Sequence, residues 1–207
     1  MSTERLVCVV DDDDAIRESL RVLLFTHGIA CRCFASAAEF LDQGPQLAIH
    51  CLLLDIRMPG MDGLELFDRL RQQKAAYPIV FITGHGDIPL AVDAIKNGAH
   101  DFLTKPFRDG ELIKTVQSAF DAFQRTRNEM ERLEVLQDRA GSLTPREREV
   151  MKLMAQGLPN KGVADELNIS PRTVEIHRAH VMEKMCADSL PALVRMVSQL
   201  GIDSPDQ

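Results

Sequence analysis

The feature that most constrains the fold is a fivefold alternation of short apolar runs with helix-like segments in residues 6–123. The apolar runs have the length and the lack of polar residues that are typical of strands buried on both faces. These predicted strands occupy residues 6–10, 29–34, 51–55, 78–83 and 101–104. The predicted helices, whose apolar residues recur at helical spacing, occupy residues 16–27, 36–41, 63–73, 88–97 and 112–123. The alternation predicts an α/β fold, a doubly wound, five-stranded parallel sheet with helices on both faces.

Polar residues follow four of the five predicted strands. They are Asp11 and Asp12 after the first strand, Asp55 at the end of the third, Thr83 at the end of the fourth and Lys105 after the fifth. Because the carboxyl ends of parallel strands lie along one edge of the sheet, we expect these side chains to share a pocket. The alternative for a single aspartate at a strand end is that it only caps the next turn. The prediction of a shared pocket therefore depends on all of these polar residues together.

Three carboxylates in one pocket repel one another and require a cation. Oxygen ligands without a histidine or a thiolate among them favour Mg²⁺. With the metal bound, one carboxylate can attack phosphorus as a nucleophile and become an aspartyl phosphate. The lysine and the hydroxyl would then hold the transferred phosphoryl oxygens. The predicted chemistry is therefore phosphoryl transfer onto an aspartate.

The motifs around these residues resemble the receiver domain of two-component response regulators. The resemblance covers residues 5–125 and is carried by Val-Val-Asp11-Asp12, Leu-Asp55-Ile-Arg-Met-Pro-Gly, Ile-Thr83-Gly-His-Gly and Phe102-Leu-Thr-Lys105-Pro106. It implies a flavodoxin-like receiver fold, with Asp55 as the phosphoacceptor and a sensor histidine kinase as the phosphoryl donor. It also implies that Mg²⁺ is bound directly by Asp12, by Asp55 and by the backbone carbonyl of Arg57, with Asp11 assisting.

The same resemblance assigns the remaining strand-end residues. Thr83 and Lys105 would be the hydroxyl and the ammonium that contact the phosphoryl group, and Thr83 with the aromatic Phe102 would form the switch. The side chains of Arg57 and His85 would flank the phosphoryl group and adjust its lifetime. The loop around His85 is rich in glycine, so an ordinary surface position is the alternative for that residue. The peptide bond between Lys105 and Pro106 is expected to be cis.

The second half of the chain carries the signals of a small helical domain. Residues 124–139 are highly charged but keep a helical apolar stripe, so the last receiver helix is predicted to continue into a linker. The stripe would suit one strand of a short coiled coil, but it is shorter than the three heptads that such an assignment needs. Thr144 and Ser170 are each followed by a proline, the pattern of a helix N-cap with proline at the first helical position. Two short helices joined by a tight turn around residues 168–170 predict a helix-turn-helix.

These helices resemble the LuxR/NarL-type DNA-binding domain, and within it the FixJ branch of regulators, over about residues 142–200. The resemblance is carried by Leu143-Thr-Pro-Arg-Glu-Arg-Glu-Val, Asn160-Lys161, Ile169-Ser-Pro-Arg-Thr-Val and His177-Arg-Ala-His-Val-Met-Glu-Lys-Met. It directs Glu175, Ile176, His177 and Ala179 toward base edges with Arg178 adjacent, and Asn160, Lys161, Arg172, Thr173 and Lys184 toward phosphates. Glu175 departs from the lysine common in the wider family, and a carboxylate can accept from cytosine N4 but cannot pair with guanine acceptors. For Arg178 and Lys184 an ordinary solvated position is the alternative.

Net charge divides unevenly between the two halves. Of the 24 basic and 31 acidic residues, residues 1–138 hold 15 and 22, a net charge of −7, and residues 139–207 hold 9 of each, a net charge of zero. DNA binding draws much of its free energy from neutralising phosphates, so a monomer with a neutral DNA-binding half would bind weakly. A homodimer formed on phosphorylation would double the phosphate contacts.

Composition adds expectations about the compartment. The first residues include only a short apolar run, so neither a signal peptide nor a membrane span is expected. The five cysteines lack the CxxC spacing of metal sites, and four lie in apolar, strand-like runs; they are Cys8, Cys31, Cys33, Cys51 and Cys186. Buried free thiols in a reducing cytoplasm are therefore predicted, rather than disulfides.

The sequence predicts a cytoplasmic, phosphorylation-dependent transcription regulator rather than an enzyme. Its receiver would span residues 1–123, its helical linker residues 124–141 and its DNA-binding domain residues 142–207. Its expected partners are a sensor histidine kinase, double-stranded promoter DNA, RNA polymerase and a second copy of the chain. The alternative is a haloacid-dehalogenase-type phosphatase, which also uses aspartate, a hydroxyl, lysine and Mg²⁺. Against it, the chain has no cap insertion, and the helix-turn-helix would have no purpose.

Overall fold

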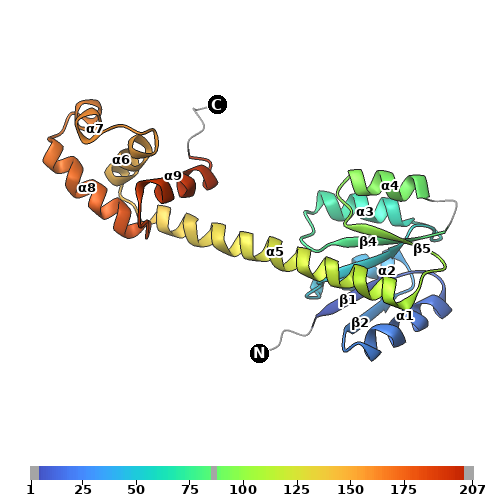
Figure 1. Cartoon of the computed structure of the whole chain (residues 1–207). Coiled ribbons are helices and arrows are strands. Elements are labelled where there is room, and N and C mark those ends of the chain that lie inside the picture. The colour runs from blue at the N-terminus through green and yellow to red at the C-terminus, as the bar shows by residue number, and fades with distance from the viewer. Residues whose placement is uncertain (1–4, 85–87, 203–207) are drawn as a thin grey trace. The chain divides into compact units, whose positions relative to one another are not determined.

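The structure is a computed structural model that describes residues 5–84 and 88–202 (Figure 1). The chain divides into two compact units, residues 1–126 and residues 127–207. The first is an α/β unit and the second is helical throughout its described residues. None of the described helices combines the length and the apolar character that crossing a membrane requires.

The first unit is built on the predicted parallel sheet. Its strands are β1 (Leu6–Val10), β2 (Ala30–Phe34), β3 (Cys51–Asp55), β4 (Ile79–Thr83) and β5 (Asp101–Thr104). Their order is β2-β1-β3-β4-β5, and every neighbouring pair is parallel. β1 and β3 lie side by side at the point where the order of the strands reverses, which is where such sheets bind ligands. The predicted α/β fold class is confirmed.

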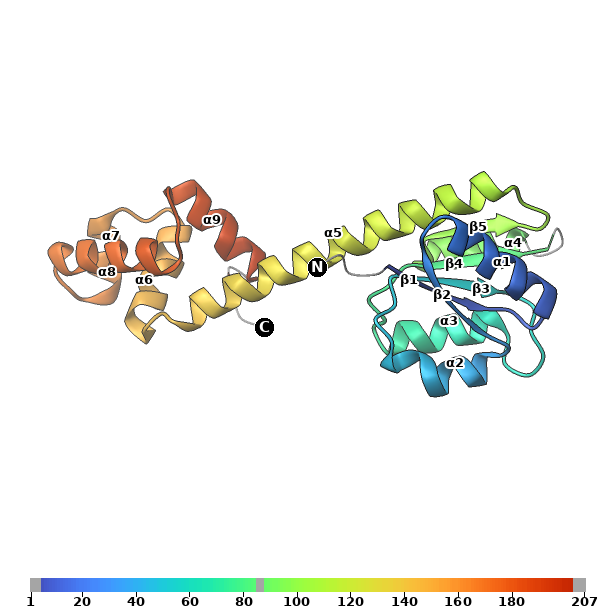
Figure 2. The same ribbon diagram turned by 90° about the horizontal axis from the view of Figure 1, so that it is seen from below.

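Helices cover both faces of the sheet. They are α1 (Asp14–Thr26), α2 (Ala37–Gln43) followed by a short 3₁₀ turn (Gly44–Gln46), α3 (Gly63–Gln72), α4 (Ile88–Lys96) and α5 (Asp109–Gly141). Buried residues of α1 and α5 pack on one face, and those of α2, α3 and α4 pack on the other. Figure 2 shows α1 and α5 across the sheet from α2 and α3. All five residues of β3 are buried, because the strand is central and both of its faces are covered.

The last receiver helix continues past the first unit, as the charged stretch predicted. α5 is a single helix of 33 residues. Its first part buries Leu112, Val116 and Ala119 against the sheet, whereas Met130 and Val135 further along are about half exposed. The apolar stripe of the linker is therefore partly open to solvent.

The second unit has the predicted helix-turn-helix. Its further helices are α6 (Pro145–Ala155), α7 (Asn160–Leu167), α8 (Pro171–Lys184) and α9 (Leu190–Gln199). Thr144 and Ser170 cap α6 and α8 as predicted, each by accepting a hydrogen bond from a backbone N–H in the first turn. Asn168 has a left-handed backbone (φ 53°), which ends α7 and allows the tight turn into α8.

The prediction about the cysteines is correct in part. All five thiols are free, and Cys8 and Cys51 are fully buried on central strands. Cys31 and Cys33 are only partly buried, because β2 lies at the edge of the sheet. Cys186 is exposed in the turn after α8. The expectation of burial, which rested on the four cysteines in strand-like runs, therefore fails for Cys31 and Cys33.

Gly63, the first residue of α3, provides a test of the packing beneath the site. A Cβ at this position would collide with the backbone carbonyl oxygen of Asp55. We expect Gly63→Ala to lower the free energy of unfolding of the receiver unit by ~1–3 kcal/mol, because a backbone atom cannot move aside. Thermal melting measures the change.

The control is Gly110→Ala on α5, where a Cβ would meet nothing within 4 Å. Removing the backbone freedom of a helical glycine should stabilise the unit by about 0.5–1 kcal/mol. Equal melting temperatures for the two variants would contradict the close approach of α3 to β3.

Candidate functional site

Lys105 joins two carboxylates from different strands at the carboxyl edge of the sheet. Its Nζ donates to Asp55 Oδ1 at 2.5 Å and to Asp11 Oδ2 at 2.8 Å. Asp55 ends β3 and Asp11 follows the neighbouring β1, so the strand order sets the two carboxylates side by side. The backbone N–H of Lys105 donates to the carbonyl of Thr83 at 2.7 Å, which fixes the loop after β5 to the end of β4. The side chains of Asp11, Asp55 and Lys105 thus meet, Thr83 joins them through its backbone carbonyl, and Asp12 is exposed.

The cluster is buried and carries more negative than positive charge. Asp11 is 1% exposed and Asp55 is 6% exposed. Burial raises the pKa of Asp55, the hydrogen bond and charge of Lys105 oppose the rise without cancelling it, and the nearby Asp11 adds to it. Burial lowers the pKa of Lys105, but its hydrogen bonds to the two carboxylates outweigh burial, so this pKa is also raised. The two shifts have different causes: burial dominates at Asp55, whereas the two carboxylates dominate at Lys105.

The donor atoms suit a hard divalent cation. Two buried carboxylates with one ammonium leave a negative charge, and Asp12 adds a third carboxylate next in sequence. Asp12 is exposed, however, and among the described residues no three acidic, histidine or cysteine side chains are grouped closely enough to hold a metal ion. Asp12 would therefore have to turn inward to join Asp11 and Asp55. Receiver domains in general bind Mg²⁺ at their phosphorylation site.

The residues around Asp55 are held by the backbone. The N–H of Arg57 donates to Asp55 Oδ2 at 2.7 Å, and Arg57 itself is exposed. The hydroxyl of the buried Thr83 donates to the carbonyl of Gly84 at 3.1 Å. Phe102 is partly buried against the core under α4. His85 lies outside the described residues.

The peptide bond between Lys105 and Pro106 is cis, as expected.

One contact near the site was not predicted from the sequence. Arg17 on α1 donates through Nη1 to the carbonyl of Asp11 at 2.6 Å and pairs with Asp14 at 2.9 Å. The spacing of three residues between Asp14 and Arg17 is the signal that could have shown it.

In the helical unit, α8 presents most of the predicted DNA-contacting residues to solvent. Arg172, Glu175 and Ile176 are exposed, and Ile176 retains 51% of its accessible surface. Thr173, His177 and Arg178 are partly buried, as is Asn160 at the start of α7, whereas Lys161 is exposed. The opposite face of α8 is buried through Val174 and Val181.

Two of these residues have a more constrained environment than predicted. Lys184 Nζ is bound within the unit, to Glu147 Oε2 at 2.7 Å and to the carbonyl of Ser142 at 3.4 Å. A phosphate would have to compete with these partners, because Glu147 is buried. His177 Nδ1 is buried and has no hydrogen-bond partner within the described structure. A buried N–H without an acceptor is costly, so we assign the proton of the neutral ring to Nε2.

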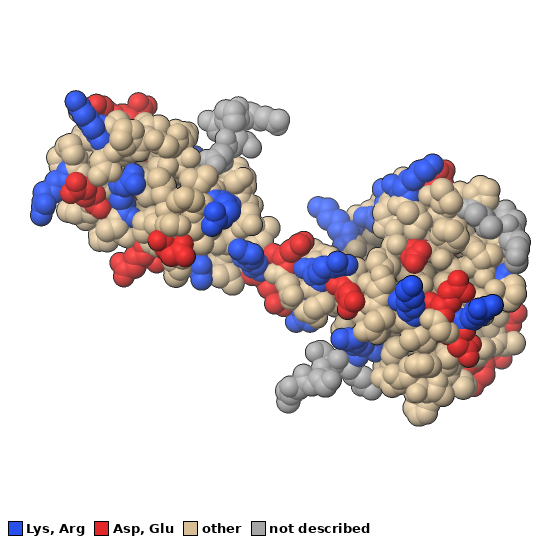
Figure 3. Space-filling model, in the orientation of Figure 1, with Lys and Arg blue, Asp and Glu red and all other residues tan. Residues whose placement is uncertain are grey.

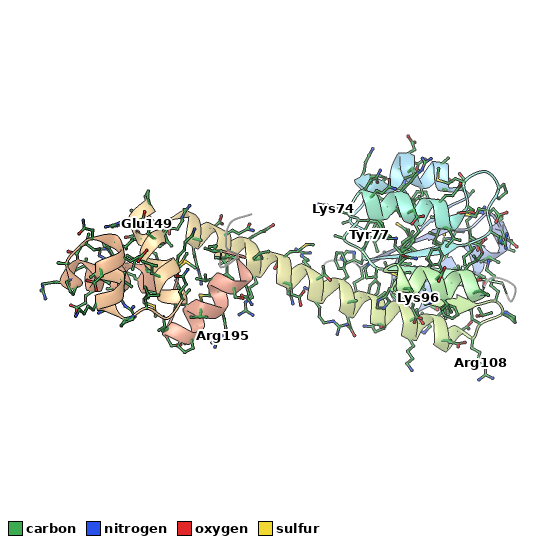
Figure 4. The ribbon with its side chains drawn as sticks, turned by 90° about the horizontal axis from the view of Figure 1, so that it is seen from above. Lys74, Tyr77, Lys96, Arg108, Glu149 and Arg195 are labelled. Carbon is green, nitrogen blue, oxygen red and sulfur yellow. The ribbon has the colours of Figure 1, made fainter. Side chains whose placement is uncertain are left out.

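Charges on this unit are interspersed. Figure 3 shows acidic side chains among the basic ones on the visible face of residues 139–202. Glu149 on α6 and Arg195 on α9 lie on the surface in Figure 4, as do Lys96 and Arg108 in the first unit. A neutral, mixed surface gives one copy of this unit little electrostatic attraction to DNA.

Comparison with known proteins decides the family. The chain matches the family "Response regulator receiver domain" over residues 7–117 and the family "Bacterial regulatory proteins, luxR family" over residues 141–197. The chain is a response regulator of the LuxR type. It is therefore a phosphorylation-dependent transcription regulator, and the family implies a sensor kinase and DNA as partners.

The relatives of this response regulator match it over nearly its whole length. The transcriptional regulatory protein FixJ of Azorhizobium caulinodans is 49% identical over 97% of this chain and 95% of its own. FixJ of Bradyrhizobium diazoefficiens is 45% identical over 98% of both chains. Among solved structures, the response regulator StyR has a TM-score of 0.80 at 42% identity, covering 95% of this chain and 100% of its own. Full-length FixJ from B. japonicum has a TM-score of 0.59 at 45% identity, covering 97% and 99%.

The raised pKa of Asp55 predicts that this response regulator gains stability when the carboxylate is neutralised. A raised folded-state pKa means that ionisation at neutral pH costs folding free energy. We expect Asp55→Asn to raise the melting temperature of the receiver unit by a few degrees at pH 7. The gain should disappear as the pH falls below the ordinary aspartate pKa of 3.8, where the wild-type carboxyl is protonated in both states.

The matched control is Asp12→Asn, which neutralises an exposed carboxylate one residue from Asp11 and should change stability by no more than ~0.5 kcal/mol. A lower melting temperature for Asp55→Asn at pH 7 would show instead that the bond to Lys105 outweighs burial.

The lowered pKa of Glu147 predicts that the stability of the helical unit has the opposite pH dependence. The hydrogen bond from Lys184, then that from the backbone of Thr144, lowers the pKa of Glu147 to about 2. The stabilisation is present above the ordinary pKa of 4.5 and is lost as the pH falls toward 2. Glu147→Gln should destabilise the unit by about 1–3 kcal/mol at neutral pH, and its difference from wild type should shrink across that range.

Amide hydrogen exchange of α6 and α8 measures this unit separately. The control is Glu149→Gln, which removes the half-exposed partner of Arg146 and should cost no more than about 0.5 kcal/mol. A difference between Glu147→Gln and wild type that persists unchanged at pH 2 is incompatible with a low pKa.

Proposed function

We propose that Asp55 accepts a phosphoryl group from a sensor histidine kinase in the cytoplasm, and that the modified chain then binds promoter DNA as a homodimer and acts on RNA polymerase. The observation that supports this site is the bond of Lys105 to both Asp55 and Asp11. It provides a carboxylate nucleophile and an ammonium in contact, with a second buried carboxylate beside them. The proposed domains are the receiver (residues 1–123), the linker (124–141) and the DNA-binding domain (142–207).

In the proposed phosphoryl transfer, the protein orients the Asp55 carboxylate and neutralises the charge of the phosphoryl group. A carboxylate oxygen of Asp55 forms a bond to phosphorus while the bond from phosphorus to the donor nitrogen breaks. Lys105 neutralises the phosphoryl oxygens, and the N–H of Arg57 orients the carboxylate. Asp11, Asp12, Asp55 and the carbonyl of Arg57 would hold Mg²⁺, which supplies further charge neutralisation. The side chains of Arg57 and His85 would affect the lifetime of the product.

The proposed switch joins the site to a dimer surface. The Thr83 hydroxyl would exchange its bond to Gly84 for a phosphoryl oxygen, and Phe102 would turn inward into the space beside it. This change lies at the surface formed by α4 and β5, where Leu90 and Val92 are 38% and 40% exposed. Apolar side chains at a surface of this kind support its use as a contact between two receivers.

A dimer would compensate for the neutral charge of the DNA-binding unit. In the proposed complex α8 enters the major groove, with Glu175, Ile176 and His177 toward base edges and Arg178 adjacent. The phosphate contacts would be Asn160, Lys161, Arg172 and Thr173, with Lys184 contributing only if it leaves Glu147. Dimerisation and DNA binding then favour each other by linkage.

Stoichiometric labelling tests the proposal. A small phosphodonor with Mg²⁺ should add one phosphoryl group per chain, and Asp55→Asn should abolish the labelling. Asp12→Asn or chelation should slow it severely, because the carboxylates then repel the incoming phosphate. Sustained turnover of a phosphate ester would favour the phosphatase alternative. Labelling of Asp55→Asn at the wild-type level would exclude Asp55.

The same samples test the coupling. Phosphorylation should raise both the dimer fraction, measured by sedimentation, and the affinity for a palindromic operator, with a steep salt dependence. Phe102→Ala should keep the labelling but lose part of both gains. A phosphorylated monomer whose operator affinity still rises would contradict the proposed dimer.

The buried Nδ1 of His177 predicts how this residue contacts DNA. With its proton on Nε2, the ring would donate to an acceptor such as purine N7. His177→Gln places its amide at the position of Nε2 and should retain most of the operator affinity. His177→Asn places its amide at the buried Nδ1 position, so it should lose the contact and destabilise the unit by about 1–3 kcal/mol. Equal operator affinities for the two variants would contradict the assignment.

A further inference from the structure

Two cysteines of the receiver touch on the face of β2 that α1 covers. Cys31 and Cys33 are separated by one residue on an extended strand, so their side chains lie on the same face. Their Sγ atoms are 3.7 Å apart. Cys33 Sγ also donates a weak hydrogen bond to the backbone carbonyl oxygen of Arg17 on α1, at 3.7 Å. The proposed phosphoryl transfer uses neither thiol.

This pair differs from the other cysteines of the chain in both exposure and proximity. Cys31 and Cys33 are partly exposed on an edge strand that pairs only with β1. Cys8 and Cys51 are fully buried, and Cys186 is exposed but lies in the other unit. Cys31 and Cys33 thus combine accessibility to solvent with a second thiol in contact.

The surroundings make the two thiols unequal. The hydrogen bond from Cys31 lowers the pKa of Cys33, and the charges of Arg21 and Arg17 lower it further, against the opposing effects of burial and of Glu18. The same hydrogen bond, together with burial, raises the pKa of Cys31. Cys33 is therefore the thiol that ionises first, and Cys31 holds its proton beside it. An accessible thiolate next to a second thiol is the arrangement of oxidation-sensitive cysteines.

We propose that Cys31 and Cys33 are an oxidation site that a hydroperoxide converts into a reversible disulfide within one chain. The thiolate of Cys33 attacks one peroxide oxygen, the O–O bond breaks, and the departing oxygen is protonated to water or an alcohol. Cys33 is then a sulfenic acid. The sulfur of Cys31 attacks the sulfenic sulfur, the S–O bond breaks, and the released hydroxide takes the Cys31 proton to form a second water. The two thiols lose two electrons, which the peroxide accepts.

The geometry of an edge strand permits this closure. Residues two apart on a strand are separated by about 6.6 Å between Cα atoms, which is near the upper limit of the ~4.4–6.8 Å that disulfides span. The sulfurs must approach from 3.7 Å, so β2 has to shorten locally. β2 can do so because one of its edges is unpaired in the sheet. A disulfide at this limit is readily reduced, which makes the modification reversible.

The site of closure can be mapped because Arg32 lies between the two cysteines. Trypsin cuts after Arg32, and a glutamate-specific protease cuts after Glu39 and so separates Cys33 from Cys51. The full-length chain is treated with hydrogen peroxide, alkylated and digested with both enzymes. We expect the intact mass to fall by two hydrogen atoms, and the peptides ending at Arg32 and at Glu39 to be joined until a reductant separates them.

Serine variants provide the controls. Cys31→Ser should stop at a sulfenic acid on Cys33, which dimedone traps, and Cys33→Ser should react with peroxide far more slowly. Cys186→Ser should close the disulfide as wild type does. Circular dichroism melting shows that each variant is folded, and alanine replaces serine in any variant that is not. Peroxide-treated wild type that retains both thiols, or that only forms links between chains, overturns the proposal.

Discussion

A single ammonium shared by two buried carboxylates is the interaction on which the receiver unit depends. Lys105 connects Asp55 on β3 with Asp11 after β1, residues 50 and 94 positions away along the chain. Removing Lys105 would leave two buried carboxylates without their counter-charge, which costs ~3–5 kcal/mol. The same cluster holds excess negative charge, which supports the proposed binding of a cation and of a phosphoryl group there. Stability and chemistry are therefore set by the same three side chains.

The order of the strands explains why these residues meet. In a parallel sheet of order β2-β1-β3-β4-β5, the carboxyl ends of β1, β3 and β4 are neighbours, and the loop after β5 joins them through its bond to Thr83. Gly63 lets α3 begin directly against the carbonyl of Asp55. The site is thus held by backbone contacts from several elements, which leaves the carboxylates little freedom to move.

The helical unit uses its charges in a different way. Glu147 accepts a hydrogen bond from the backbone N–H of Thr144 at the start of α6 and binds Lys184 at the end of α8, so one buried carboxylate connects these two helices. Residues 139–207 hold 9 basic and 9 acidic residues, so this part of the unit has no net positive charge with which to attract phosphates. This distribution of charge is the physical argument for our proposal that DNA binding depends on pairing two chains.

The sequence by itself determined the elements and their order. The signals used were local: apolar runs of strand length, polar residues at strand ends, and proline after Thr144 and Ser170. Such signals can be identified without knowing which distant residues are in contact. They were sufficient for the sheet, for the meeting of Asp11, Asp55 and Lys105 at its carboxyl edge, and for the helix-turn-helix. Only the tertiary structure decided which charges pair across long separations. The bond of Lys184 to Glu147 spans 37 residues. The exposure of Asp12 depends on the elements packed around it. The contact of Cys31 with Cys33 is open to solvent only because β2 lies at an edge of the sheet. Pairing and burial depend on the positions of neighbours from other parts of the chain, which no local pattern specifies.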